Sequence, residues 1–290
     1  MYKKRLMLPV SLAFAISAAG CSGIDDASSP APEDSQQEET TVPADQNAET
    51  GAEENEAEAD GIEENSTEED NSQSGSTQKA EDVIGKVKEQ LKMENAILPS
   101  SFPLKEGTHL SASIEEDKTD SYQVTFYQTN EVVPVNDPSL TPDGDAPVVA
   151  VFKAHIKTAA DNDQELFPPM SVDDEIPAEM AIDLGHDIKG MGEGAAGHKY
   201  LSWKEGNWIL QISSVSEDQM DDQAVARQMV DYLESHYLPA PHDDGRIKVH
   251  YRQGGNEVEN DIYWEDGERI YELQTKKVPL EALEMAVSIK

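Results

Sequence analysis

Alternating apolar and polar residues predict a sheet that begins near residue 109. Residues 109–114, 122–129 and 148–155 place apolar side chains at every second position, as half-buried strands do. Residues 131–136 fit a further short strand, which Pro134 interrupts. These segments therefore predict the first strands of an antiparallel sheet.

Helical spacing precedes this run of strands. Over residues 79–95, apolar residues recur every three or four positions with charged residues between them, which predicts an amphipathic helix. Its apolar positions are Val83, Ile84, Val87 and Leu91. Two later segments lack such a pattern: residues 158–182 are polar and contain proline, and residues 182–197 are glycine-rich and predict a loop.

A repeated pattern dominates the last third of the chain. Residues 201–212 match residues 262–273, and each copy has an aromatic-rich strand, a tight turn and a second alternating strand. Gly206 and Gly267 each lie three residues after a tryptophan and supply the positive φ that such turns need. Each copy therefore predicts a β-hairpin. The matching tryptophans are Trp203 and Trp264.

Each predicted hairpin leads into an amphipathic helix. Ser216 and Gln219 have the spacing of a capping box for the first helix, and Pro279 suits the first turn of the second. Residues 238–245, rich in proline and aspartate, separate the two units. The apolar faces are Ala226, Met229, Val230, Leu233 and Tyr237 in the first helix, and Leu280, Leu283 and Val287 in the second.

Residues 22–78 contain almost nothing that could form a core. From residue 22 to residue 82 there are 20 acidic residues and one basic residue. Low hydrophobicity with high like charge cannot offset chain entropy, so we expect a disordered acidic tether, about 40 Å long as a free coil. A spacer and low-complexity filler both fit this composition.

Together these patterns predict an α+β fold: an antiparallel sheet with two hairpin–helix repeat units in the C-terminal half, preceded by the disordered acidic tether. The globular domain spans residues 80–290, with 80–180 and 181–290 as candidate sub-units, after a linker over residues 21–79. Residues 83–290 carry 39 acidic and 18 basic side chains, a formal net charge of −21. This balance speaks against nucleic acid as a partner, because nucleic acid needs a basic surface.

Residues 1–20 have the regions of a signal peptide. Residues 3–5 are basic, and the apolar stretch over residues 6–16 is too short for a membrane-spanning helix, which takes about 20 apolar residues. The stretch ends in Ala-Ala-Gly-Cys at residues 18–21. Cys21 is the only cysteine, which excludes internal disulfides and cysteine-based zinc sites.

Residues 18–21 resemble the lipobox of bacterial lipoproteins, although Ala18 stands where that family usually has leucine. The resemblance implies that residues 1–20 are removed and that Cys21 carries lipid, including palmitate-type chains. Two acyl chains give stable attachment, so Cys21 would hold the protein on the extracytoplasmic face of the cell membrane. An ordinary signal peptide with a chance cysteine is the alternative.

Four histidines in the C-terminal half are candidates for a metal-binding or acid–base role, and two of them lie beside carboxylates in the sequence. They are His186, His198, His236 and His242. None has the ligand spacing of a zinc site. Residues 161–165 alternate oxygen ligands and residues 143–145 form an acidic turn, but the EF-hand positions fail. We therefore expect neither a metal nor a cofactor.

Catalytic motifs are equally sparse. Residues 192–197 fit GxGxxG, but a predicted strand follows them instead of a helix, so a flexible connector is the simpler interpretation. There is no GxSxG or SxxK motif, and no carboxylate pair stands out for glycoside hydrolysis. The sequence thus predicts no catalytic residue.

Aromatic residues gather on the two predicted hairpins. Alternation puts Leu201 and Trp203 on one face, and Tyr200 and Ser202 on the other. Core packing under the helices is one interpretation, and a shallow aromatic groove for a peptide, glycan or lipid is the other. The aromatic set is Tyr200, Trp203, Trp208, Tyr263, Trp264 and Tyr271.

From residue 102 onward the chain resembles lipoproteins of low-GC Gram-positive bacteria whose function is uncharacterised. The resemblance rests on residues 183–185, 200–208 and 286–289. It implies an extracytoplasmic location and an α+β fold, and it transfers no catalytic residue. We therefore expect a membrane-anchored binding or interaction module for an unknown envelope ligand or protein. A hydrolase acting on wall polymer and a hydrophobic-ligand carrier are the alternatives.

Overall fold

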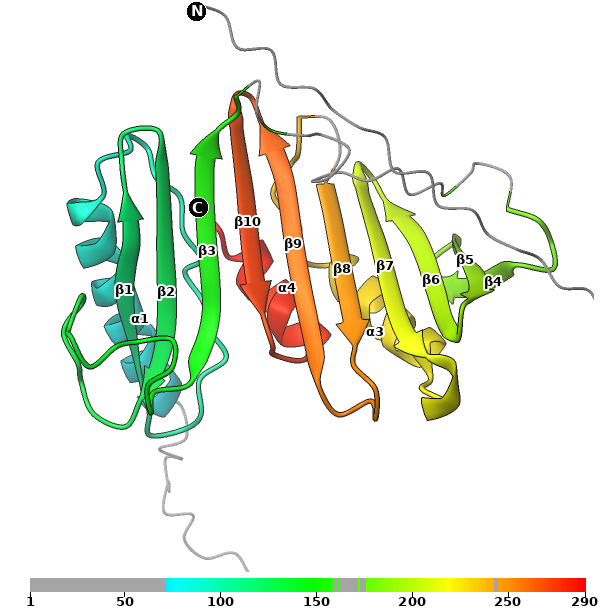
Figure 1. Cartoon of the computed structure of the whole chain (residues 1–290), viewed down its shortest axis with the longest axis horizontal. Coiled ribbons are helices and arrows are strands. Elements are labelled where there is room, and N and C mark those ends of the chain that lie inside the picture. Colours follow the sequence, from blue (N-terminus) through cyan, green and yellow to red (C-terminus); the bar gives the residue numbers. More distant parts are fainter. Residues whose placement is uncertain (1–70, 159–160, 162–171, 173–175, 243–244) are drawn as a thin grey trace, which may run out of the picture. The chain divides into compact units, whose positions relative to one another are not determined.

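A computed structural model describes residues 71–158, 161, 172, 176–242 and 245–290, with side chains from residue 80. Within these residues the chain forms one mixed ten-stranded open sheet and three α-helices (Figure 1). Cys21 and the predicted signal peptide lie outside the described residues. The elements are α1 (Asn71–Gln90), β1 (His109–Asp117), β2 (Ser121–Thr129), β3 (Val148–Ile156), β4 (Ala181–Gly185), β5 (Ile188–Ala195), β6 (His198–Glu205), β7 (Trp208–Val215), the 3₁₀ turn η1 (Ser216–Asp218), α3 (Asp222–Leu233), β8 (Gly245–Tyr251), β9 (Val258–Asp266), β10 (Arg269–Thr275) and α4 (Pro279–Val287).

The strand order is β1-β2-β3-β10-β9-β8-β7-β6-β5-β4, and it mixes strands from both halves of the globular region. Every neighbouring pair is antiparallel except β7 and β8, which are parallel. The expectation of an antiparallel sheet is therefore corrected at this pair. Parallel neighbours need a crossover, and α3 carries the chain from the end of β7 back to the start of β8.

Both predicted hairpin turns are confirmed. The β6–β7 and β9–β10 hairpins each turn through two residues, and Gly206 and Gly267 have φ of 59° and 62°. Trp203 pairs with a residue of β7, and Trp264 occupies the matching position opposite β10. A helix follows each hairpin, α3 after the first and α4 after the second.

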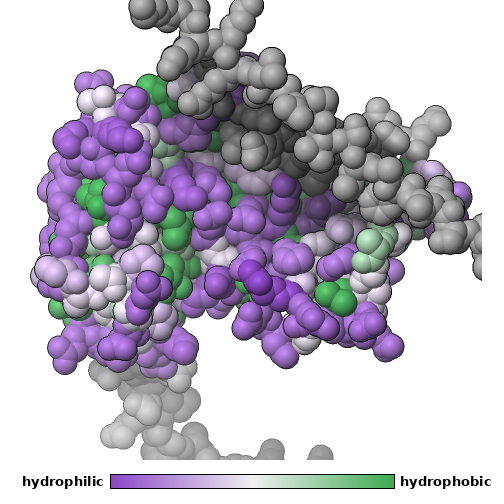
Figure 2. Space-filling view, viewed as in Figure 1, coloured by the Kyte–Doolittle hydropathy of each residue, from purple (hydrophilic) through white to green (hydrophobic). Residues whose placement is uncertain are grey.

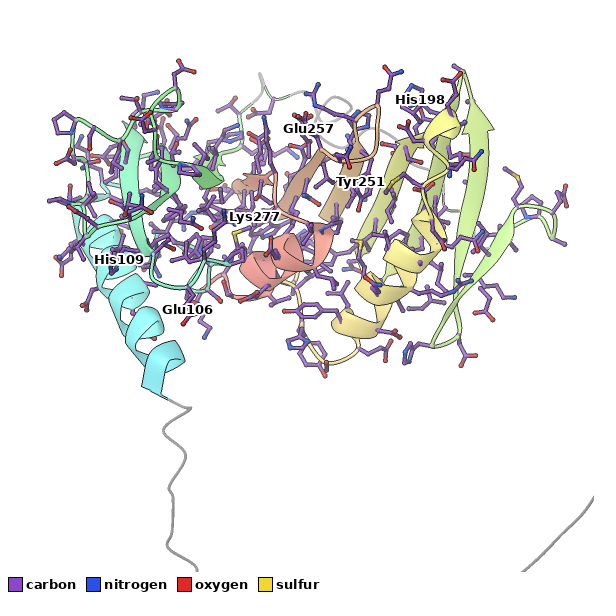
Figure 3. All side chains as sticks on the ribbon, turned by 90° about the horizontal axis from the view of Figure 1, so that it is seen from below. Glu106, His109, His198, Tyr251, Glu257 and Lys277 are labelled. Carbon is purple, nitrogen blue, oxygen red and sulfur yellow. The ribbon has the colours of Figure 1, made fainter. Side chains whose placement is uncertain are left out.

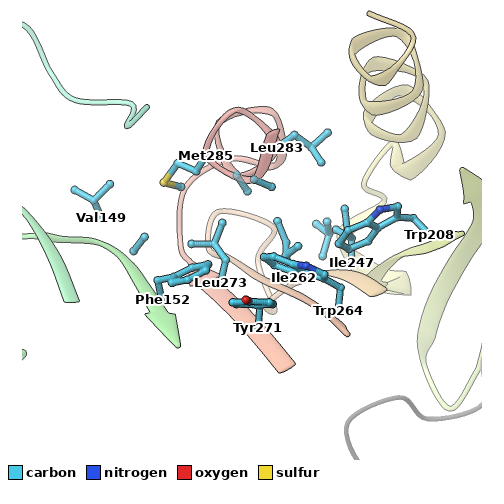
Figure 4. Packing of buried hydrophobic residues seen from close by; sticks show 14 of the residues in the cluster. Val149, Phe152, Trp208, Ile247, Ile262, Trp264, Tyr271, Leu273, Leu283 and Met285 are labelled. Atoms are coloured by element: carbon cyan, nitrogen blue, oxygen red, sulfur yellow. The ribbon is translucent and has the colours of Figure 1, made fainter. Parts of the chain in front are cut away.

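The hydrophobic core lies between the sheet and the helices, because α1, α3 and α4 cover the same side of the sheet (Figure 3). Trp203 and Trp264 are 0% and 1% exposed, so they belong to this core. The Trp264 ring lies 6.0 Å from the Trp208 ring, 6.3 Å from Phe152 and 5.0 Å from Tyr271 between centroids (Figure 4). Aromatic pairs at such distances add to the stabilisation from burial.

Two expectations in the N-terminal half need correction. The helix predicted over residues 79–95 instead spans Asn71–Gln90, so the predicted tether does not reach residue 78. Residues 131–136 form no strand, because the chain turns there, and Asn136 contributes hydrogen bonds to the edge of β1. The strands predicted near β1, β2 and β3 are confirmed, with ends shifted by a few residues.

The glycine-rich residues 182–197 are a hairpin, not the expected loop or connector. They form β4 and β5. A Cβ built on Gly190 would lie 2.7 Å from Leu201 Cδ1 and 3.1 Å from Leu184 Cδ1. Glycine is needed here because neighbouring side chains fill the space above the strand, so a glycine-rich composition is compatible with strand structure.

Local expectations at the start and end of α3 were also wrong. Ser216 and Gln219 do not cap the helix, since residues Ser216–Asp218 form a 3₁₀ turn and Asp221 is the N-cap, with its side chain accepting from Ala224 N at 3.0 Å. Tyr237 follows the end of α3 and is 82% exposed, so it is no part of the apolar face.

The two edges of the sheet are covered by different groups. Beside β1, Asn136 Oδ1 accepts from Ile114 N at 2.7 Å, and Asn136 N donates to Ala112 O at 2.9 Å. Beside β4, the Arg227 guanidinium of α3 donates to Asp183 O from Nε at 3.2 Å and from Nη2 at 3.0 Å. Side-chain groups at an edge oppose pairing with a strand of another chain.

Candidate functional site

The side of the sheet opposite the helices carries polar side chains from its central strands. We call it the polar face. The part of this face that is visible in Figure 2 is mostly hydrophilic. Alternation along each strand sends most apolar residues to the helices and most polar residues to this face, which also carries Val151, Ile209 and Ile270. Its members are Lys153 on β3, Glu272 and Gln274 on β10, Asp261 and Tyr263 on β9, Arg246, Lys248 and His250 on β8, Gln211 and Ser213 on β7, and Ser202 on β6.

Strand register aligns these side chains in rows across the sheet. One row runs from Lys153 through Glu272 and Tyr263 to Arg246. The next runs from Gln274 through Asp261, Lys248 and Gln211 to Ser202. Directly opposed side chains on neighbouring strands lie close enough to interact, so each row is a continuous line of polar side chains.

Hydrogen bonds connect the rows on the β3 side of this face. Lys153 Nζ lies 3.0 Å from Glu272 Oε2 and 3.1 Å from Gln274 Oε1. Gln274 Nε2 in turn donates to Asp261 Oδ1 at 3.0 Å. These contacts hold a lysine and two carboxylates in fixed positions.

Further along, Lys248 lies over the Tyr263 ring, 5.1 Å from its centroid. Burial lowers the pKa of Lys248, although the charge of Asp261 opposes this shift. Burial likewise raises the pKa of the Tyr263 hydroxyl. Arg246 is 5% exposed and donates from Nη1 to Gly245 O at 3.1 Å. These groups are partly withdrawn from water, which strengthens polar contacts made to them.

The β7 side of the face is hydroxyl- and amide-rich. Gln211 Nε2 donates to Ser202 Oγ at 3.0 Å, and Ser213 Oγ lies 2.9 Å from His250 Nδ1. Cations and carboxylates are thus interleaved with uncharged donors and acceptors. In a chain of formal net charge −37, this face carries side chains of both charge signs.

The histidines singled out by sequence are scattered and form no common site. His198 packs near Tyr200, and His236 stacks on Tyr232 with centroids 4.0 Å apart. The backbone N–H of His242 donates to Glu265 O at 2.8 Å. In the part of the chain that the structure describes, no group of three His, Cys, Asp or Glu side chains could hold a metal ion.

His186 lies in contact with carboxylates from another element. Its Nε2 lies 2.8 Å from Asp231 Oδ1, and its Nδ1 lies 3.8 Å from Glu234 Oε2. Glu205, which sequence reasoning missed, interacts with the same group: burial first, and then the charge of Glu234, raise its pKa to about 7. A charged residue next to a turn glycine gives no sequence signal of burial.

The remaining candidates resolve as structural features or lie outside the described residues. Residues 143–145 are part of a turn, and most of residues 161–165 are not described. Residues 192–197 are the end of β5 and its turn, so no phosphate-binding loop leads into a helix. Trp203, Trp208, Trp264 and Tyr271 are buried, which favours core packing over an aromatic groove.

Comparisons with family models, with curated proteins and with solved structures find no match to this chain. Among the described residues, no helix is long and apolar enough to span a membrane.

Proposed function

We propose that this protein is a lipoprotein anchored through Cys21 to the extracytoplasmic face of the cell membrane, where it acts as a binding module. The basic, apolar and small-residue segments before the only cysteine support the anchor. We also propose that residues 21–70 act as an acidic spacer, and that the two hairpin–helix units are a structural repeat. Their equivalent turns support the last point.

The polar face is the proposed ligand surface. One observation carries this assignment: polar side chains of both charge signs lie in register across central strands that bury apolar residues on their other side. Fixed donors and acceptors on a sheet suit a polar polymer, such as a glycan or an extended peptide. A lipid carrier would need an apolar surface, so the polar face gives that alternative no support.

The anchor is tested by Cys21→Ala in the full-length protein. We expect the variant to leave the membrane fraction or to stay unprocessed, measured by fractionation and intact-mass spectrometry. A variant that is processed and remains membrane-bound like the wild type would contradict the lipid anchor.

The ligand surface is tested by Lys248→Ala and Gln211→Ala on the full-length protein extracted in detergent. Mass spectrometry of co-purified glycans and peptides should find a species on the wild type that both variants lose. Lys276→Ala is the matched control, because its side chain is 82% exposed and lies beside Glu259 at 4.0 Å, away from these two residues. Equal ligand retention in all three variants would contradict the assignment of the polar face as the ligand surface.

A further inference from the structure

A group of four titratable side chains from three separate elements meets at the C-terminal end of α3. We call it the acid–histidine cluster: His186, Glu205, Asp231 and Glu234. His186 comes from the β4–β5 turn, Glu205 ends β6, and the other two lie in the last turn of α3 and at its C-cap. The cluster therefore joins the edge hairpin of the sheet to a helix.

The contacts leave the cluster with excess negative charge. His186 Nε2 bonds Asp231 Oδ1 at 2.8 Å, and Nδ1 stands 3.8 Å from Glu234 Oε2. Glu205 feels the charges of both Glu234 and His186. A helix C-terminus already carries partial negative charge, which disfavours carboxylates and favours cations. A protonated His186 is the one cation among the four cluster members.

Other charged residues on the β4–β5 hairpin, α3 and β6 do not remove the excess negative charge of the cluster. The hairpin contributes Asp183, Asp187 and Lys189, and the hollow of about 400 Å³ at its end is lined by these residues together with His186. Arg227 on α3 directs its guanidinium to Asp183 O. Lys204 precedes Glu205, but alternation sends its side chain to the opposite side of the sheet.

Glu205 lies in a position that suits a neutral carboxyl. Its Oε1 is buried, and the Nε1–H of Trp203, which is also buried, is the donor beside it. The nearby indole favours the ionised form slightly, but less than burial and Glu234 oppose it. Burying an ionised carboxylate in such a place is costly.

The β4–β5 turn that presents His186 is held in an unfavourable conformation. His186 and Asp187 are its two central residues, with φ of 51° and 62°, a turn type that prefers asparagine and glycine. Left-handed conformations cost non-glycine residues energy, and the contacts of His186 with α3 help to offset that cost.

We propose that protons hold the β4–β5 hairpin against the end of α3, so that the hairpin is docked in mild acid and loosens as the pH rises. In the docked state Glu205 is neutral and His186 is a cation bonded to Asp231. Loss of both protons leaves three carboxylates beside a neutral imidazole at a helix C-terminus. Loosening would uncover Leu184, which is 1% exposed, and the outer edge of β5.

The direction of this pH dependence follows from both Glu205 and His186. The pKa of Glu205 is raised to about 7 by burial and by Glu234, and the pKa of His186 is raised by its bond to Asp231. A group whose pKa is higher in the docked state than in the undocked state stabilises docking when the pH is below its undocked pKa. This stabilisation is lost as the pH rises through the pKa of the docked state. Each proton released shifts the docking equilibrium by about tenfold per pH unit within that window.

Hydrogen exchange of the full-length protein, read by mass spectrometry at pH 5.5 and 8.0, tests the proposal. After correction for intrinsic exchange rates, protection of residues 181–190 should fall by about tenfold at pH 8.0, a conservative value because His186 is partly exposed. Peptides from β10 should keep their protection and thereby exclude global unfolding. Unchanged protection of residues 181–190 between the two pH values would overturn the proposal.

Two variants and a control sharpen the result. Glu205→Gln mimics the neutral carboxyl, so residues 181–190 should keep most of their protection at pH 8.0. Asp231→Asn should instead lower their protection at pH 5.5, because the ion pair with His186 is lost. Asp266→Asn, at the position in β9 equivalent to Glu205, should behave as the wild type. A Glu205→Gln variant that loses protection as the wild type does, or an Asp231→Asn variant with normal protection at pH 5.5, contradicts the mechanism.

Discussion

The unit of β6, β7 and α3 and the unit of β9, β10 and α4 turn at equivalent glycines and bury equivalent tryptophans, yet their surroundings differ. The second unit lies in the middle of the sheet, between β3 and β8. It is also tied to the segment after α1, since Arg269 donates to Glu94 O and Asn95 O at 2.8 and 3.1 Å. The first unit adjoins only the short β5–β4 hairpin on its outer side.

The difference appears in the residue two positions after each tryptophan. In the central unit Asp266 is exposed to solvent, whereas in the outer unit Glu205 has a buried carboxyl oxygen and a raised pKa. Similar local sequences therefore form the same hairpin in both places. Position in the sheet decides whether the carboxylate at its end is solvated or becomes part of a titratable cluster.

Truncating the two tryptophans should give the largest losses of stability in the two units. Trp203→Ala and Trp264→Ala should each lower the free energy of unfolding by about 3–5 kcal/mol, with Trp264→Ala at the upper end because its ring packs against three aromatic rings. Urea denaturation followed by circular dichroism measures the loss. Tyr237→Ala, 82% exposed, is the control and should change stability by less than about 0.5 kcal/mol.

The pH dependence of stability should distinguish Glu205 from Asp266. Because its pKa is raised in the folded state, Glu205 stabilises the fold below about pH 4.5, and this contribution is lost as pH rises through about 7. Relative to Glu205→Gln, the wild type should lose about 1–2 kcal/mol between pH 4.5 and 8, after discounting for partial exposure. Asp266→Asn should run parallel to the wild type in the same urea titrations.

The two turn glycines should respond alike. Gly206→Ala and Gly267→Ala place a side chain at φ near 60° with open space around it, so each should cost about 1–2 kcal/mol through backbone strain alone. Gly85→Ala in α1 is the control and should gain about 0.5–1 kcal/mol. Markedly unequal losses at the two turns would show that the hairpins are not equivalent.

Helix capping should give the smallest difference in stability between the two units. Asp221 caps α3 through its side chain, and Asp221→Ala should cost about 1 kcal/mol. The N-cap of α4 is Val278, which makes no capping bond and is 55% exposed, so Val278→Asp should gain about 0.5–1 kcal/mol. Thermal unfolding of the two variants against the wild type measures both shifts.

Local sequence determined the two hairpins, their turns and most of the apolar positions of the helices. A glycine three residues after a tryptophan, between alternating strands, leaves few backbone choices, and Pro279 can begin a helix but not continue one. The polar face was also implicit, because alternation that buries Trp203 and Leu201 must turn Ser202 away.

What sequence missed required knowledge of neighbours. Residues 182–197 were expected to form a loop because glycine weakens a strand, but Leu184 and Leu201 supply the packing that Gly190 lacks. The parallel pairing of β7 with β8 follows from where α3 returns the chain. The charges that act on Glu205 come from a hairpin and a helix end that lie about twenty and thirty residues away in sequence. Strand pattern is a local property of the chain, whereas sheet order and the electrostatic environment of a side chain arise only when distant segments pack together.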